Sequence, residues 1–261
     1  MKQIAYYLLF TFLLTYLAHG LLAYLTTNNL IAFNAFIGQL LFILGGSSPT
    51  IFGIVFILRN ASTNTENQFL SRLFSYKHKV VIWVFAILTP VLIGAMFQVT
   101  YLIFKDHTMT APLPFYLFFF ILLISILLGG LEEVGWRGFL QARLMPGKNL
   151  ILISIVIGII WALWHIPLFF IESVSHYDYN FLPFLFGAIM FSTYLTWLYA
   201  ITKSILLVVM FHAAINASAS IGFSLIFEHS VLAYLLLTLF TLVGILLIYA
   251  TANNNAVVSE T

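Results

Sequence analysis

Long apolar stretches separated by short polar segments make up almost the whole chain. Eight of these stretches reach the roughly 20 residues that an α-helix needs to cross the hydrocarbon core of a bilayer. The pattern therefore predicts an all-α fold, a polytopic membrane helix bundle with about eight transmembrane helices. The expected spans are 4–26, 31–58, 80–104, 114–144, 150–171, 182–201, 204–227 and 231–250.

Some local features refine this pattern. The first stretch follows Lys2 as a signal peptide would, but it is long enough to span and no small-residue cleavage site follows, so we expect an uncleaved helix. The run GGSSP at 45–49 contains a proline that removes a backbone donor, which predicts a kink or break. We expect the polar segment 59–79 to be a loop. The chain is expected to form a single domain, 1–261, with a disordered tail at 252–261.

Composition agrees with a membrane location. Hydrophobic residues make up 62% of the chain and charged residues 7%, against about a quarter charged in an ordinary soluble domain. The net charge of +2, without a basic run, gives no reason to expect a nucleic-acid partner. The chain has no cysteine, which excludes disulfides, a thiol nucleophile and thiolate metal ligands.

Lysine and arginine positions predict the orientation. With the N-terminus in the cytoplasm, Lys105 is the one basic residue in an outer connection, and Arg137 lies inside a span. This segregation follows the positive-inside rule and requires an even number of spans, so we expect both termini in the cytoplasm. The short connections favour a bacterial cell membrane. The basic residues assigned to the inner side are Lys2, Arg59, Arg72, Lys77, Lys79, Arg143, Lys148 and Lys203.

Ionisable side chains inside the spans are costly and point to function by default. Glu133 and Arg137 are four residues apart, which places them on one helix face in the orientation that favours an ion pair. Glu132 points about 100° away, so we expect it to face something other than the arginine. We expect His19, by contrast, to make a structural helix–helix hydrogen bond.

Two further spans carry polar groups at a similar depth. At about 1.5 Å rise per residue, Glu132 and Asn216 lie on the order of 18 Å from the cytoplasmic end, His165 about 22 Å and His212 about 12 Å. His212 and Asn216 are four residues apart and share a face. A carboxylate, two imidazoles and a carboxamide in one buried cavity could activate water and hold an oxyanion.

Three motifs in this order resemble the CAAX protease and bacteriocin-processing (CPBP, or "Abi") family of intramembrane proteases, related to the Ras-converting CAAX endopeptidases. They are EEVGWR at 132–137, WALWH at 161–165 and HAAIN at 212–216. The second departs from the family pattern because Trp161 stands where phenylalanine is usual. The resemblance covers about 115–220, the expected catalytic core.

The resemblance implies an intramembrane endopeptidase that cuts a membrane-associated or lipid-modified peptide or protein, and we expect the cut near the cytoplasmic face. Glu132 and His165 would activate the attacking water, and His212 with Asn216 would hold the oxyanion, while Glu133 and Arg137 give structural support. We expect no obligatory cofactor, because there is no HExxH motif and Asn216 suits an oxyanion better than zinc.

Alternatives remain open at this stage. A divalent metal such as zinc could bind Glu132, His165 and His212 with one open position. The polar groups could instead serve packing in a non-catalytic membrane partner, such as an immunity or scaffold protein. An ion-coupled transporter would suit the break at 45–49, although we find no matching break in a second half of the chain.

Overall fold

The structure is a computed structural model that describes residues 2–59, 63–105, 113–223 and 230–259. Every regular element in these ranges is helical. Five apolar helices are long enough to cross a membrane, one of them (α8) when its 3-10 extension η3 (Ile166–Phe170) is included. They are α1 (Lys2–Thr27), α5 (Val80–Lys105), α8 (Leu150–Trp164), α9 (Phe181–Thr202) and α11 (Val231–Ser259).

Two further spans are broken. The first consists of α2 (Phe36–Gly46) and α3 (Ser48–Leu58), which bend by 47° at the predicted break. The second bends by 46° between its halves, a bend that the sequence did not predict. Its halves are α6 (Leu117–Ser125) with the π-helical turn η1 (Ile126–Gly130), and the π-helical η2 (Val134–Gln141) with α7 (Ala142–Leu144).

The second bend lies where helix 205–220 comes close to the backbone of Gly129. The backbone of Leu128 and Gly129 leaves helical geometry, and a Cβ atom on Gly129 would collide with the carboxamide of Asn216. Glycine therefore permits a close contact there that any side chain would block. Glu132 and Glu133 lie in the turn between η1 and η2, so the bend sets where both carboxylates point.

The remaining elements are α10 (Ile205–Ser220), a shorter apolar helix, the 3-10 turn η4 (Ser175–Asp178), and α4 (Thr63–Leu73). The prediction of a loop at 59–79 was wrong where α4 forms. Phe69 of α4 is buried in the core, and Leu73, one turn later, packs against the same core. An apolar pair four residues apart stabilises a helix against the bundle, although the segment is polar on average.

The predicted fold class is confirmed. The five long helices, the two broken spans and α10 correspond to the eight expected stretches. The α-helix of the fifth stretch ends at Trp164, before Pro167, and that of the seventh ends at Ser220. Helix α11 continues to Ser259, and nothing further tests the tail predicted at 252–261.

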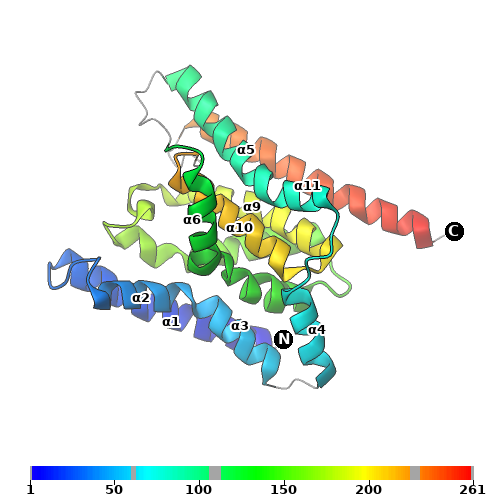
Figure 1. Cartoon of the computed structure of the whole chain (residues 1–261), viewed down its shortest axis with the longest axis horizontal. Coiled ribbons are helices and arrows are strands. Elements are labelled where there is room, and N and C mark those ends of the chain that lie inside the picture. Colours follow the sequence, from blue (N-terminus) through cyan, green and yellow to red (C-terminus); the bar gives the residue numbers. More distant parts are fainter. Residues whose placement is uncertain (1, 60–62, 106–112, 224–229, 260–261) are drawn as a thin grey trace.

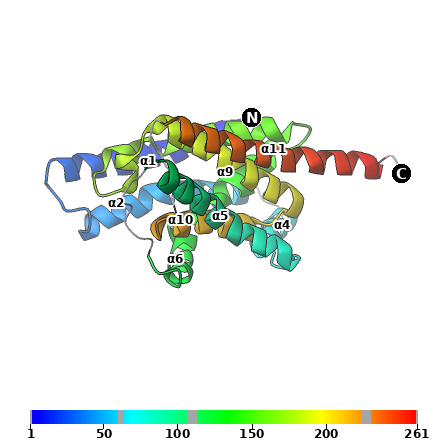
Figure 2. The same ribbon diagram turned by 90° about the horizontal axis from the view of Figure 1, so that it is seen from above.

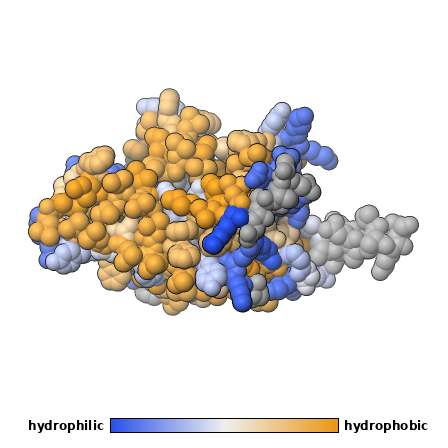
Figure 3. All heavy atoms as spheres, turned by 90° about the horizontal axis from the view of Figure 1, so that it is seen from below, coloured by the Kyte–Doolittle hydropathy of each residue, from blue (hydrophilic) through white to orange (hydrophobic). Residues whose placement is uncertain are grey.

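The arrangement of the helices is consistent with a membrane protein. Both ends of the chain lie toward the right of Figure 1, whereas the α1–α2 and α8–α9 connections lie at the left. Seen from above in Figure 2, α11 runs along α9, which it contacts closely. The lateral surface is largely hydrophobic in Figure 3, as expected for side chains that face lipid.

The two broken spans pack directly against each other. A Cβ atom on Gly53 of α3 would lie 2.7 Å from the Cα atom of Gly135 in η2, so the backbones meet without side chains between them. Beside this contact, the Thr50 hydroxyl donates to the carbonyl oxygen of Leu131 over 2.7 Å. The broken span α2–α3 thus supports the turn that carries Glu132.

Candidate active site

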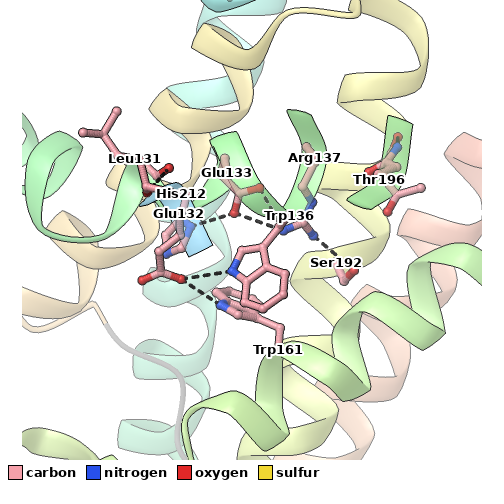
Figure 4. Close-up of polar contacts among 11 residues, drawn as sticks. Leu131, Glu132, Glu133, Trp136, Arg137, Trp161, Ser192, Thr196 and His212 are labelled. Atoms are coloured by element: carbon pink, nitrogen blue, oxygen red, sulfur yellow. Dashed lines mark hydrogen bonds and ion pairs between the residues drawn. The ribbon is translucent and has the colours of Figure 1, made fainter. Parts of the chain in front are cut away.

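One side of the turn between η1 and η2 holds a buried cluster of charged groups. The Arg137 Nη1 atom lies 2.8 Å from Glu133 Oε2, which confirms the predicted ion pair. The Nη2 atom of Arg137 donates to the Ser192 hydroxyl over 3.1 Å, and Nδ1 of His212 lies 2.7 Å from Glu133 Oε1 (Figure 4). Glu133 is therefore held by Arg137, four residues further along the chain, and by His212, 79 residues away.

Glu132 lies on the other side of this turn. Its Oε2 atom accepts hydrogen bonds from two indole N–H groups, Trp161 at 3.1 Å and Trp136 at 3.4 Å (Figure 4). Among the described residues, neither basic group of the cluster is bonded to Glu132. This agrees with the prediction that helix spacing separates the two glutamates. The Oε1 atom of Glu132 is the one left available to a water molecule.

The last turn of α8 fixes the orientation of His165. The residue follows the end of α8 and is buried, and its Nδ1 atom lies 2.8 Å from the carbonyl oxygen of Trp161. A carbonyl oxygen only accepts, so Nδ1 carries the proton and a neutral ring presents its Nε2 lone pair. The indole of Trp164 packs edge-on against the imidazole at 4.7 Å. These two contacts fix the position of the His165 ring.

His212 and Asn216 approach one point near Gly129. Because Nδ1 of His212 faces Glu133, its Nε2 atom is the free ring nitrogen, and it lies 3.8 Å from the position of a Cβ atom on Gly129. The Nδ2 atom of Asn216 lies even closer to that position. Two nitrogen atoms from one face of α10 thus meet where the backbone leaves space, as the spacing in the sequence predicted.

All four predicted catalytic residues line one cavity of about 500 Å³. Its walls come from α1, the α2–α3 break, α6 with η1, the end of α8, the α8–α9 connection, α9 and α10. Glu133 and Arg137 do not line it. The geometry brings Glu132, His165, His212 and Asn216 together, and their chemical roles stay predictions.

Two histidines of the cavity wall were not expected to be part of it. His19 bonds to the carbonyl oxygen of Phe42 over 3.0 Å, which confirms the predicted helix–helix hydrogen bond, but its ring also lines the cavity. His176, in the α8–α9 connection, stacks on His165 with centroids 5.3 Å apart and planes 15° apart. Desolvation, followed by the nearby His19, lowers the pKa of His176 to about 4. No spacing pattern in the sequence indicates such a loop contact.

The residues present were also compared with the needs of a metal ion. Within the described ranges, no group of three or more histidine, aspartate or glutamate side chains is arranged to hold one. Glu132, His165 and His212, the alternative ligand set, do not form such a group in the described part of the chain. The requirement for a metal is not tested by this geometry.

Two comparisons with known proteins bear on this site. Residues 114–218 match the family of type II CAAX prenyl endopeptidases described as Rce1-like. The chain is also 28% identical over 231 residues to "CAAX prenyl protease 2" of Methanococcus maripaludis. The aligned region covers 80% of this chain and 81% of that protein. These matches confirm the relationship that the three motifs indicated. That relative is archaeal, so the expected bacterial origin has no support from it.

Proposed function

We propose that this relative of the Rce1-like CAAX endopeptidases is an intramembrane endopeptidase in which Glu132 and His165 activate water. The observation that carries the proposal is the position of Glu132: it bonds to two indoles instead of to Arg137 or His212, and it lines the cavity with His165, His212 and Asn216. The expected substrate is a membrane-associated or lipid-modified peptide or protein.

The first step is the attack of water on the scissile carbonyl carbon. Glu132 Oε1 and His165 Nε2 are the two acceptors for the proton that the water oxygen loses as it forms its bond to carbon. The indole donors on Oε2 keep the carboxylate oriented while Oε1 changes its partner. The proton is later given to the leaving amine as the C–N bond breaks.

The second requirement is a site for the negative charge on the carbonyl oxygen. Nε2–H of His212 and the carboxamide N–H of Asn216 are the donors beside Gly129. We assign the imidazolium form to His212. Two carboxylates, one guanidinium and one imidazolium then sum to zero charge, which avoids an unbalanced charge inside the membrane.

Purified protein with a panel of membrane-tethered peptides tests the proposal. We expect Glu132→Gln, nearly isosteric, to lower the cleavage rate by about 10²–10⁴-fold, the usual contribution of a general base, with an unchanged melting temperature. A Glu132→Gln variant that cleaves as fast as the wild type would reject the assignment.

Two separate assays address the two alternatives. A non-catalytic immunity or scaffold protein would keep its cellular function with Glu132→Gln. An ion-coupled transporter would show uptake in proteoliposomes that depends on an ion gradient. The bend in the second broken span adds a break that the sequence did not predict, but it positions Glu132 beside Gly129 and the donors of α10, which supports the hydrolytic site.

A further inference from the structure

The cavity lies toward one end of the helices that form it. It is lined by Trp161, at the end of α8, and by the second half of α10 as far as Ser220. From α9, which runs in the opposite direction to α8, it is lined by residues between Phe184 and Phe191, in the first half. From α1 it is lined by His19, in the last third. These parts of the helices share the end that the α8–α9 connection covers.

Aromatic packing closes the other end of the cavity. Beyond Glu132, the fully buried side chains of Tyr7, Trp136 and Phe139 fill the bundle. The centroid of the Tyr7 ring lies 4.6 Å from that of Phe139 and 6.0 Å from that of Trp136. The ring of Phe56 also packs on Phe139, with centroids 5.8 Å apart. None of Tyr7, Phe56, Trp136 and Phe139 lines the cavity.

The basic connections of the chain meet beyond this aromatic layer. The Lys203 ammonium lies 3.9 Å from the sulfur of Met145, and the Ser204 hydroxyl donates to the Ser75 carbonyl over 2.8 Å. These contacts join the α4–α5, α7–α8 and α9–α10 connections at one face. In Figure 3 hydrophilic side chains gather toward the right of the view, the side on which α4 lies in Figure 1.

Of the ten lysines and arginines of the chain, Lys77, Lys79, Lys148 and Lys203 lie in these three connections, and Arg72 and Arg143 lie in the helices that lead into two of them. These six residues define the basic face. Arg137 is in the buried cluster, and Lys105 ends α5 at the end away from Lys79. Short connections rich in lysine and arginine stay in the cytoplasm. The basic face is therefore the cytoplasmic one, and the aromatic layer separates it from Glu132.

We infer that the cavity opens toward the extracytoplasmic side of the membrane and receives its peptide from there. Ser175 and Ser220 are exposed cavity-lining residues at this end, and Leu127 and Leu128 expose apolar surface beside them. The identification of the ligand as a peptide rests on the proposed function, whereas the direction of the opening does not. It assigns as substrate class a translocated, membrane-anchored peptide, and it reverses the expectation of a cut near the cytoplasmic face.

Cysteine labelling tests the inference because the natural chain has no cysteine. Single variants Ser175→Cys and Ser220→Cys place a thiol at the cavity opening, and Ser71→Cys places one on α4 at the basic face. All three serines are exposed. In intact cells, a membrane-impermeant maleimide should label the first two and leave Ser71→Cys unlabelled. After permeabilisation, Ser71→Cys should react as well.

Controls make each outcome decisive. Labelling of the detergent-solubilised protein establishes that each thiol reacts with the maleimide. If the thiol of Ser175→Cys does not react there, Tyr177→Cys replaces it, because Tyr177 is exposed in the same connection. Labelling of Ser71→Cys in intact cells, alone or together with the other two, would overturn the inference. So would Ser175→Cys and Ser220→Cys thiols that react only after permeabilisation.

The labelling pattern needs no catalytic activity, so its outcome is independent of the proposed function. A protein that labels as expected but cleaves no peptide would contradict the endopeptidase assignment and leave the orientation intact. In an active preparation, a bulky maleimide on Ser175→Cys, applied to intact cells, should block cleavage, whereas the same reagent on Ser71→Cys in permeabilised cells should not.

Discussion

The charged cluster around Glu133 and the cavity beside Glu132 lie on two sides of the same turn, and they treat the same type of residue in opposite ways. Within the cluster, Arg137 and His212 hold both oxygens of Glu133 at 2.7–2.8 Å. In the cavity, two neutral indoles hold one oxygen of Glu132. Adjacent glutamates can therefore be divided between a buried ion-pair cluster and a cavity wall by one step of helical rotation.

The largest effect should come from breaking the cluster. Arg137→Met removes the cation that Glu133 faces inside the bundle, and losing one partner of a buried ion pair typically costs about 3–5 kcal/mol of unfolding free energy. The melting temperature in detergent should fall sharply. Arg143→Met is the matched control, because Arg143 is half-buried at the basic face over the ring of Phe139, and we expect a much smaller loss.

On the cavity side, Asn216→Ala should damage catalysis and leave stability unchanged. Removing one oxyanion donor typically lowers kcat by about 10²–10³-fold. Ser220→Ala, one turn further along the same helix, is the control that should keep near-normal kcat. If Asn216→Ala lowers the melting temperature as much as Arg137→Met, the division between the two sides is wrong.

The two indole donors provide a finer measure of how Glu132 is held. Trp161→Phe restores the usual residue of the related family and removes the shorter bond, so we expect a loss in kcat of roughly tenfold, since a hydrogen bond to a charged group contributes about 1.5–3 kcal/mol. Trp136→Phe removes the longer bond and should change kcat less. Equal losses in steady-state assays would show that bond length does not rank these donors.

The smallest effect should appear at the rim, where His176 has a lowered pKa. Between its ordinary pKa near 6.5 and the folded value of about 4, an opened connection binds a proton that the closed one does not. Acid should therefore favour opening, and protection of 171–180 from hydrogen exchange should be lower at pH 5 than at pH 7. His19 and His165 also face this ring, so His176→Phe, which keeps the aromatic stack, should abolish most of the difference.

Features set by local spacing could be predicted from the sequence. The break at 45–49 follows from one proline, and the ion pair of Glu133 with Arg137 follows from a separation of four residues. Apolar run length predicted the five long helices, the two broken spans and the position of α10. The shared depth of the polar groups predicted that His165, His212 and Asn216 would meet Glu132 in one cavity.

Features that depend on distant contacts could not be predicted in this way. His212 lies 79 residues from Glu133 and Ser192 lies 55 from Arg137, so no helical period relates them. The bend at Gly129 arises where α10 comes close, and the helix α4 forms because Phe69 finds the core. In each case the partner, rather than the local sequence, decides the geometry.

The contact between Gly53 and Gly135 has a mechanical consequence. Where two backbones touch without side chains, neither helix can slide or rotate without a steric clash, so α3 and η2 form the stiff wall of the cavity. The part of the cavity wall that can move is then the α8–α9 connection, which carries His176. On the proposed function, a large peptide would displace this connection, whereas Glu132 would stay in place.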